Sequence, residues 1–408
     1  MMPDGWKKDF LGNLFDFKNG LNTEKENYGS GFKFVNVMDV FGNDVLTESK
    51  IMGRVQISEK QLSDYQLRYG DVLFNRTSET FEEIAMAAVY LDNALATFGG
   101  FVIRGRPKSN EILPEYLAFL FQSSAYRTQV IKLGQGAVRA NIGQKDLAKV
   151  SVLIPTIKEQ KKIIQILIRW NKAIVIIEKL LINGFQQKKS LMQQLLNGHT
   201  RLPGFSDRWM GGVLGDIATI DSGFAFKSNT FINADNGIPI IRMNNLKNGR
   251  LDISGAVKIS PEITKGLERF SLLENDFLFG MSGSLNNYAW VTAKDLPCYL
   301  NQRVGRITAK NNHDQTFITY LYLSDKVQKS ILDKAEGAAQ LNISINDLRE
   351  TPINYPAPKE QKKIAEILLS AENYNIKLQQ KLHCLKQEKK ALMQQLLTGK
   401  RRVKVDAA

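Results

Sequence analysis

The most restrictive feature of this sequence is a stretch that occurs twice at a fixed spacing. The letters Lys-Glu-Gln-Lys-Lys-Ile begin at Lys158 and again at Lys359, and Leu-Met-Gln-Gln-Leu-Leu begins at Leu191 and again at Leu392. Both pairs are 201 residues apart (359 − 158 and 392 − 191). Loops tolerate insertions and deletions, so an equal length between matched ends indicates a rod whose length matters.

Both copies carry the pattern of a long helix. Thr156 and Glu159 have the spacing of a capping box, and Pro358 suits a first helical turn. Gly198 and Gly399 stand where a helix ends. Alternating steps of four and three residues give the heptad pattern of a coiled coil, with each helix about 58 Å long at 1.5 Å per residue. The seam predicted to join the two helices and to contribute to subunit contacts consists of Ile163, Leu167, Trp170, Ile174, Ile177, Leu181, Leu191, Leu195, Ile364, Leu368, Leu378, Leu382, Leu385, Leu392 and Leu396.

The segment before the first helix has the pattern of a globular domain with mixed strands and helices. Alternating apolar residues predict strands over 32–40 and 99–104, and Gly70 is predicted to open a turn into a buried strand. Helical spacing predicts a helix over 113–133 that ends at Gly134.

The segment between the two helices repeats this plan less regularly. Trp209, Gly215 and Gly223 echo Trp6, Gly12 and Gly20 at an offset of 203 residues (209 − 6), so loop lengths vary inside the domains but not in the rods. The sequence therefore predicts four parts: globular domains at 1–154 and 199–355, and helical regions at 155–198 and 356–408.

This order predicts the architecture. Each half is one structural unit, so the halves should be related by a pseudo-twofold axis. Two helices that share a seam under that symmetry must run antiparallel. We therefore expect an α+β protein with two globular α/β domains joined by two long antiparallel helices that form a coiled coil.

The charge of the chain indicates its class of partner. The net charge of +14 and the pI near 9.5 favour a polyanion, with nucleic acid the first choice and an anionic membrane surface the second. No stretch approaches the ~20 apolar residues of a membrane span, and the absence of an apolar leader makes a cytoplasmic location the default expectation. Two cysteines and three scattered histidines cannot supply a disulfide framework or a zinc site, so we expect no metal in this chain.

Catalytic motifs are absent from the sequence. It contains no phosphate-binding loop of Walker type and no Gly-x-Gly-x-x-Gly before a helix. The Asn-Pro-Pro-aromatic motif typical of amino-methyltransferases is also missing. Together these absences favour a binding protein over an enzyme.

Two similar modules on a spacer of fixed length suit recognition of a two-part DNA site. Base edges are read chiefly by Arg, Lys, Asn and Gln, and phosphates are held by cations. Such side chains that follow apolar strands or lie at the glycine breaks are the candidates for DNA contact: Arg76, Arg104, Arg106, Arg139, Asn141, Lys145, Asn286, Asn287, Tyr288, Arg303, Arg306, Gln340 and Asn342. Each could instead be an ordinary surface residue. For Asn141 and Asn342, a cap on the next helical segment is the simpler interpretation.

At this point the sequence resembles a known family. The Pro-x-x-x-Glu-Gln-x-x-Ile entry to a long helix, the Leu-Met-Gln-Gln-Leu-Leu-x-Gly exit, and Leu202-Pro203-Gly204-Phe205 before Trp209 are similar to the specificity subunit of type I restriction–modification systems. The resemblance covers the whole chain, although the recognition domains match only in outline.

The resemblance implies a subunit without catalytic activity that binds double-stranded DNA, two adenine-N6 methyltransferase subunits and, with them, restriction subunits. S-adenosylmethionine, ATP and Mg²⁺ would be bound by those partners. The helices would set the distance between half-sites, and the Glu-Gln-Lys-Lys entries and Met-Gln-Gln exits would help to dock the methyltransferase.

Two other functions stay open at this stage. One is a coiled-coil scaffold whose end domains bind proteins, which would bind no nucleic acid and show no salt dependence. The other is an enzyme on nucleic acid with an unfamiliar active site, which incubation of the purified chain with DNA, metal and methyl donor would reveal.

Overall fold

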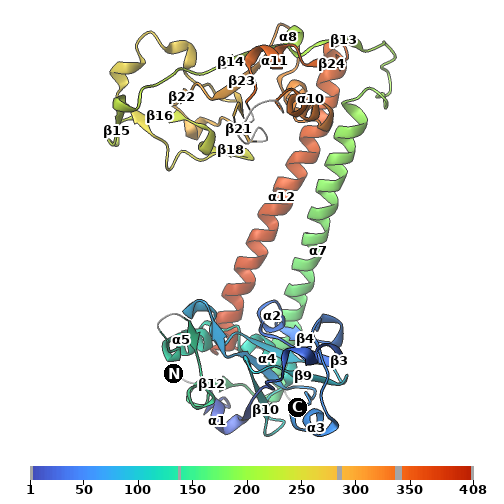
Figure 1. The fold of residues 1–408 in the computed structure, drawn as a ribbon, viewed down its shortest axis with the longest axis vertical. Coiled ribbons are helices and arrows are strands. Elements are labelled where there is room, and N and C mark those ends of the chain that lie inside the picture. The colour runs from blue at the N-terminus through green and yellow to red at the C-terminus, as the bar shows by residue number, and fades with distance from the viewer. Residues whose placement is uncertain (1–2, 137–138, 283–286, 336–341, 406–408) are drawn as a thin grey trace. The chain divides into compact units, whose positions relative to one another are not determined.

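The computed structural model describes residues 3–136, 139–282, 287–335 and 342–405. It divides into two compact units, one formed by residues 1–178 with 380–408 and the other by residues 179–379. Each unit thus combines one globular domain with the beginning of one long helix and the end of the other. Figure 1 shows these helices, α7 (Ile157–Leu195) in green and α12 (Pro358–Leu397) in red. None of the described helices is both long and apolar enough to cross a membrane.

The globular domain of the first unit is built on two sheets. The larger has five strands in the spatial order β2 (Phe15–Asn19), β10 (Val102–Pro107), β6 (Val72–Asn75), β8 (Ala87–Tyr90) and β4 (Val45–Leu46). The smaller has the order β5 (Arg54–Val55), β3 (Tyr28–Val35) and β9 (Ala96–Phe98). Short ladders pair β1 (Lys7–Phe10) with β12 (Ser151–Ile154) and β7 (Thr77–Ser78) with β11 (Ala140–Asn141). All residues of β6 are buried, which confirms the buried strand predicted after Gly70.

Short helices cover these sheets. They are α1 (Leu11–Leu14), α2 (Val37–Phe41), α3 (Glu59–Tyr65), α4 (Pro114–Leu120), α5 (Ser124–Leu133) and α6 (Gln144–Leu147). The strand predicted over 32–40 is wrong in its second half, because Asn36 and Asp39 form a capping box that starts α2. In it, Asn36 N–H donates to the Asp39 carboxylate at 2.8 Å.

The single helix predicted over 113–133 is in fact two helices. The Ser123 hydroxyl accepts a hydrogen bond from Tyr126 N–H at 3.3 Å and starts α5 after a break. The apolar spacing continues across the break because α4 and α5 bury side chains in the same core. The predicted end at Gly134 is confirmed.

The globular domain of the second unit repeats this plan with larger sheets. The six-stranded sheet has the order β14 (Ala218–Ser222), β23 (Val304–Ala309), β20 (Phe277–Gly280), β21 (Tyr288–Trp290), β18 (Gly249–Leu251) and β17 (Leu246–Lys247). Beside it lie β15 (Phe231–Ile232), β19 (Lys258–Ile259), β16 (Ile238–Ile241) and β22 (Tyr299–Leu300), and β13 (Met210–Val213) pairs with β24 (Pro352–Tyr355). The main helices are α8 (Leu214–Ile217), α9 (Gln315–Tyr322), α10 (Asp325–Ala335) and α11 (Ile345–Arg349). The order β14-β23-β20-β21 matches β2-β10-β6-β8, so the two domains share one scaffold.

The long helices agree with the sequence prediction. They have 39 and 40 residues. The Thr156 hydroxyl accepts a hydrogen bond from Glu159 N–H at 3.3 Å, and Pro358 is the first residue of α12. Beyond the helices, Gly198 and Gly399 have φ angles of 73° and 69°, a left-handed conformation that glycine adopts without a steric penalty.

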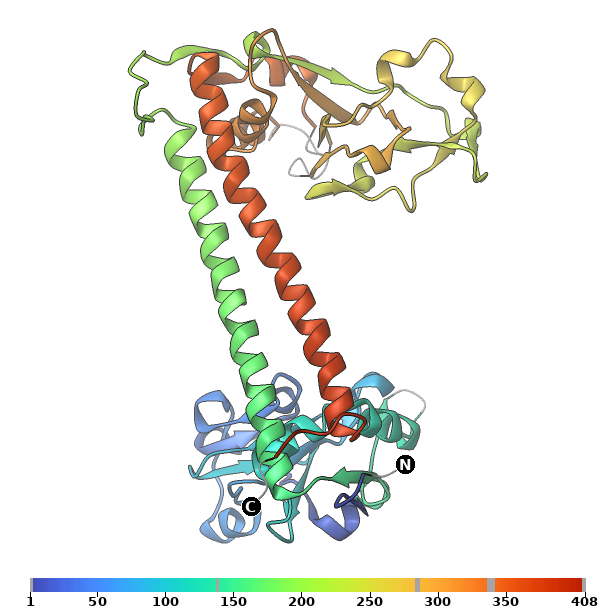
Figure 2. The ribbon, with the colours of Figure 1, turned by 180° about the vertical axis from the view of Figure 1, so that it is seen from behind.

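The two helices run antiparallel within each unit. In the first unit the start of α7 packs against the end of α12, where Ile163 and Leu396 share one core. In the second unit the start of α12 packs against the end of α7, where Ile364 and Leu195 share another (Figure 2). Every residue of the predicted seam is buried or half-buried. Any role of these residues in contacts with other subunits stays a prediction.

The repeated Glu-Gln entry has a structural cause inside each unit. The Gln160 side chain, fully buried, donates to the carbonyls of Glu111 and Pro155, both at 2.9 Å, and accepts from Leu113 N–H at 2.8 Å. Gln361 donates in the same way to Pro356 O at 2.8 Å. These glutamines fasten each helix to its own domain. Among the residues of this motif only the lysines are exposed to a partner, and the role of the motif in docking stays a prediction.

The two glutamates of the motif are each clamped by an arginine that follows the other long helix. In the first unit Arg402 Nε donates to Glu159 Oε1 at 2.7 Å, and Trp6 Nε1 donates to Glu159 Oε2 at 3.0 Å. In the second unit Arg201 donates to both oxygens of Glu360, at 2.9 and 2.7 Å. Both carboxylates are 2% exposed. The segment after α12 thus supplies the arginine that binds the buried glutamate of the first unit, and the segment after α7 supplies the equivalent arginine in the second unit.

Two lysines of the long helices, Lys188 on α7 and Lys389 on α12, also interact with their domains. Lys188 Nζ pairs with Glu372 and lies 5.3 Å from the centre of the Tyr320 ring. Burial lowers the pKa of Lys188 and of Lys389, and the negative charge of Asp44 opposes the shift at Lys389. The ammonium groups of Lys188 and Lys389 are therefore close to the carboxylates of Glu372 and Asp44.

One close approach on the helix pair of the second unit yields a prediction. A Cβ at Gly184 would lie 2.1 Å from Asn375 Oδ1, and the buried Asn375 amide has no hydrogen-bond partner among the described residues. We expect Gly184→Leu to lower the free energy of unfolding by about 1–3 kcal/mol, because the new side chain must displace Asn375. Urea unfolding measures this change.

The equivalent positions in the other half provide the control for this prediction. They are Leu385 and Ile174, so Asn375→Ile added to Gly184→Leu recreates an apolar pair that the chain already uses. The double variant should recover most of the lost stability, since it also removes an unsatisfied amide. A double variant no more stable than Gly184→Leu alone would contradict the proposed packing.

The two cysteines differ in accessibility, which gives a test of the second domain. Cys298 is buried and burial raises its pKa to about 12, whereas Cys384 is exposed on α12. Because the thiolate is the reactive form, a thiol reagent at pH 8 should modify only Cys384 in the native protein and both cysteines in denaturant. The Cys384→Ser variant should stay unmodified until it unfolds, and rapid native labelling of that variant would show that Cys298 is accessible.

Candidate nucleic-acid interface

In the first domain, loops from distant parts of the sequence gather at one end of the larger sheet. Arg76 N–H, just after β6, donates to Phe101 O at 2.9 Å, and Ile142 N–H donates to Arg76 O at 3.0 Å. The pairing of β7 with β11 places Asn141 opposite Thr77. The end of β6, the turn before β10 and the segment around β11 therefore form one surface, which we call the loop cluster of the first domain.

The second domain forms the same cluster with the same backbone bonds. Met281 N–H donates to Arg303 O at 3.1 Å, and Ile343 N–H donates to Met281 O at 3.0 Å. A bridge pairs Ser282 with Asn342. The shared scaffold thus brings equivalent segments together in both domains.

A hollow adjoins the loop cluster of the second domain. Its volume is about 870 Å³. It is lined by Phe226, Ser228, Phe231, Arg242, Met243, Asn244, Ser282, Asn301, Gln302 and Arg303. Among the described residues this lining includes two arginines and several amides and hydroxyls but no carboxylate, a composition suited to phosphates and base edges.

Four predicted residues of the first domain lie in or beside its cluster. Arg76 is half-buried, with Nη1 donating to Gly100 O at 3.5 Å, while Arg139, Asn141 and Lys145 are exposed. Neither asparagine caps a helix, since the caps are Gly143 for α6 and Ser344 for α11. The helix-cap interpretation of Asn141 and Asn342 is therefore wrong.

The other two predicted arginines of the first domain, Arg104 and Arg106, are used inside the fold. Arg104 is 8% exposed and lies 5.7 Å from the Phe98 ring, and burial lowers its pKa. Arg106 forms two hydrogen bonds to the buried Asp71, at 2.8 and 2.6 Å. These positions make both weak candidates for DNA contact.

The predicted residues of the second domain separate in the same way. Arg303 lines the hollow, and Asn342 is exposed beside it. Arg306 instead binds Asp276 at 3.2 Å and the carbonyls of Ser271 and Arg269 at 3.1 and 3.0 Å. Tyr288 packs against Phe277, and Asn287 is half-buried. Asn286 and Gln340 lie outside the described residues.

Sequence reasoning missed several residues of the hollow, namely Arg242, Asn244, Asn301 and Gln302. The correspondence between Gly20 and Gly223 in the two halves could have indicated the position of the hollow in the sequence. A Cβ on Gly20 would lie 2.0 Å from Gly99 O, and one on Gly223 would lie 2.1 Å from Leu300 O. Both glycines therefore lie where the chain passes close to the turn that precedes β10 in the first domain and β23 in the second.

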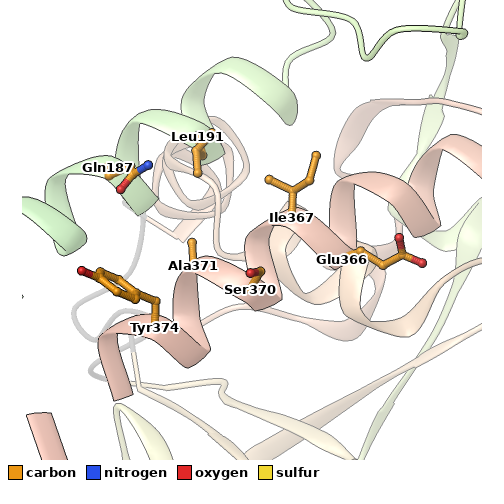
Figure 3. Close-up of a pocket in the computed structure, with 7 residues that line it drawn as sticks. All are labelled: Gln187, Leu191, Glu366, Ile367, Ser370, Ala371 and Tyr374. Carbon is orange, nitrogen blue, oxygen red and sulfur yellow. The ribbon is translucent and has the colours of Figure 1, made fainter. Parts of the chain in front are cut away.

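The helix pair of the second unit carries a separate surface. A groove of about 540 Å³ is lined by Gln187 and Leu191 from α7 and by Glu366, Ile367, Ser370, Ala371 and Tyr374 from α12 (Figure 3). Exposed apolar residues of α12 lie beside the groove, where Leu369 is 44% exposed, and beyond it, where Ile376 is 41% exposed.

The same stripe occurs in the first unit. Ile168 and Val175 of α7 are 36% and 47% exposed, and they stand 201 residues before Leu369 and Ile376 (369 − 168 and 376 − 175). Seven-residue spacing places each pair on one helix face, which differs from the seam. We call these pairs the second stripe of each unit.

Comparison with known proteins identifies relatives over nearly the whole chain. Residues 3–184 and 206–386 each match the model of the type I restriction modification DNA specificity domain. The type I restriction enzyme MjaVIII specificity subunit of Methanocaldococcus jannaschii is 26% identical, with 73% of this chain and 72% of that protein covered.

Solved structures share the fold. A chain from a structure of the type I R-M system has a TM-score of 0.63 at 16% identity, covering 98% of this chain and 100% of that one. The S subunit of the M. genitalium type I restriction-modification system has a TM-score of 0.54 at 15% identity, with 96% of both chains covered. Because both halves match the family model, the chain belongs to the type I restriction–modification DNA specificity family.

Proposed function

We propose that this chain is the DNA-binding specificity subunit of a type I restriction–modification complex, in which each globular domain reads one half of a two-part site. The observation that carries this proposal is the loop cluster, which occurs in both domains on the same backbone bonds but with different side chains. Two domains that recognise different DNA sequences require a shared backbone scaffold with different side chains in the loops that contact DNA. The net charge of +14 supports binding to a polyanion.

The division of labour follows from this proposal. The chain itself carries no catalytic step. Two methyltransferase subunits would bind S-adenosylmethionine and methylate adenine, and restriction subunits would use ATP and Mg²⁺. The assembly would act on double-stranded DNA in the cytoplasm.

Selection from a random duplex library by the chain assembled with its methyltransferase tests the reading of DNA. We expect enrichment of two short blocks at a fixed separation, with binding that weakens steeply as salt rises. Enrichment of one contiguous block, or of none, would contradict the proposal. Salt-independent retention of proteins instead of DNA would favour the coiled-coil scaffold, the alternative function.

The second stripe is proposed to dock the methyltransferase subunits. Isolated exposed apolar residues are common on proteins, but equivalent residues on two helices, 201 positions apart, are not explained by chance exposure. A partner helix with an apolar face could pack along each stripe, and in the second unit it could also enter the neighbouring groove. One stripe per unit accounts for two methyltransferase copies.

A further inference from the structure

The loop clusters of the two domains contain the same turn with different side chains. Val102 N–H donates to Gly99 O at 2.9 Å, and Val304 N–H donates to Asn301 O at 2.9 Å. In each turn the third residue accepts a hydrogen bond from the strand end beside it, Phe101 from Arg76 and Arg303 from Met281. Phe101 and Arg303 are therefore structurally equivalent positions.

The side chain at this position of the first domain is an exposed aromatic. Phe101 is 65% exposed, the most exposed phenylalanine of the described residues. Its backbone is fixed on both sides, by the turn and by the bond to Arg76, so the ring projects from a rigid base. Next to it the Arg76 guanidinium donates to Gly100 O at 3.5 Å. An apolar ring beside a cation suits an apolar base edge close to phosphates.

The side chain at this position of the second domain is an exposed cation. Arg303 borders the hollow together with Arg242, Asn244 and Gln302. Arginine forms paired hydrogen bonds with O6 and N7 of guanine, whereas an apolar side chain contacts the methyl group of thymine. The same place in the fold thus offers opposite chemistries to DNA.

We propose that the two domains read their half-sites with these opposite chemistries. Phe101 contacts a thymine methyl group in the half-site of the first domain, and Arg303 contacts a guanine in the half-site of the second. This inference rests on the proposed function and adds the base-contacting residue of each domain. It also explains why one scaffold can serve two sequences.

The test measures base discrimination by Phe101→Ala and Arg303→Ala in the chain assembled with its methyltransferase. Duplexes carry the selected wild-type site with each base pair replaced in turn. For each variant the affinity for the selected site is divided by the affinity for each replaced site. The measurements use reduced salt, so that a weaker overall affinity does not hide the result. We expect Phe101→Ala to lose roughly 10-fold discrimination at one T·A pair of one block, and Arg303→Ala to lose as much at one G·C pair of the other block.

Each variant has internal and matched controls. The unaffected block reports that the chain is folded. Tyr69 precedes the start of β6, and Lys294 follows the end of β21 that pairs with the start of β20. Both are exposed and lie away from the loop clusters, so Tyr69→Ala and Lys294→Ala should leave every ratio unchanged. Unchanged ratios in Phe101→Ala or Arg303→Ala, or losses in both blocks, or a loss at the other kind of base pair, would overturn the inference. If the wild type selects no two-block site, the proposed function itself fails.

Discussion

A chain that carries Leu369→Asp and Ile376→Asp should bind one methyltransferase subunit instead of two. Adding Ile168→Asp and Val175→Asp should abolish binding. These substitutions place carboxylates on the second stripe of each unit, where a partner helix would have to bury them. The loss at each stripe should be roughly 100-fold in affinity, the scale of central apolar contacts in protein interfaces.

Native mass measurement of the reconstituted complexes reads this directly as two, one and zero bound partners. Leu273 is 65% exposed and lies outside the helices, so Leu273→Asp is the matched control and should leave two partners bound. Retention of both methyltransferase subunits by the fourfold variant would remove the stripe from the interface.

Arg201→Met should destabilise the protein by about 3 kcal/mol, because it leaves the Glu360 carboxylate buried without its charged partner. Glu360 is 2% exposed, and its side-chain hydrogen bonds among the described residues all come from Arg201. Arg402→Met should cost less, about 1–2 kcal/mol, since Trp6 still donates to Glu159. Urea unfolding of the two variants measures the difference.

The control for this pair of predictions is neutralisation of the carboxylate. Glu360→Gln added to Arg201→Met removes the stranded charge, so the double variant should be more stable than Arg201→Met alone. Arg208 is exposed in the same linker, and Arg208→Met should change the stability little. Equal losses for Arg201→Met and Arg208→Met would show that the clamp contributes nothing specific.

The helical half of the fold could be predicted from sequence because its constraint is periodic and local. Each signal depends only on residues close to it in the sequence. The structure agrees with the heptad spacing, with Pro358 in the first helical turn and with Gly399 after the helix end. The fixed spacing of the repeat also implied the antiparallel arrangement. The predicted bounds of elements were wrong where a helix cap interrupted the apolar periodicity. Asn36 starts α2 inside a predicted strand, and Ser123 starts α5 inside a predicted helix.

The candidate interface was harder to predict because its residues come from segments far apart in sequence. A pattern search selects arginines after apolar strands, but it cannot tell Arg303, which lines a hollow, from Arg306, which binds Asp276. Arg303 is the third residue of the turn before β23, whereas Arg306 lies within that strand, and the sequence pattern alone does not mark this boundary. Phe101 was not among the candidates because the search for base-reading residues considered polar side chains. Its turn nevertheless matches that of Arg303.

The methylated motif in DNA from a host that carries this chain with its methyltransferase is the most direct test of two-part reading. We predict two blocks with N6-methyladenine in both, separated by a fixed gap. Insertion of one heptad at matched positions in both long helices lengthens each by about 10 Å, so the gap should grow by about 3 base pairs while the blocks stay the same. A contiguous motif, or a gap that does not change with helix length, would contradict the proposed function of the helices and domains.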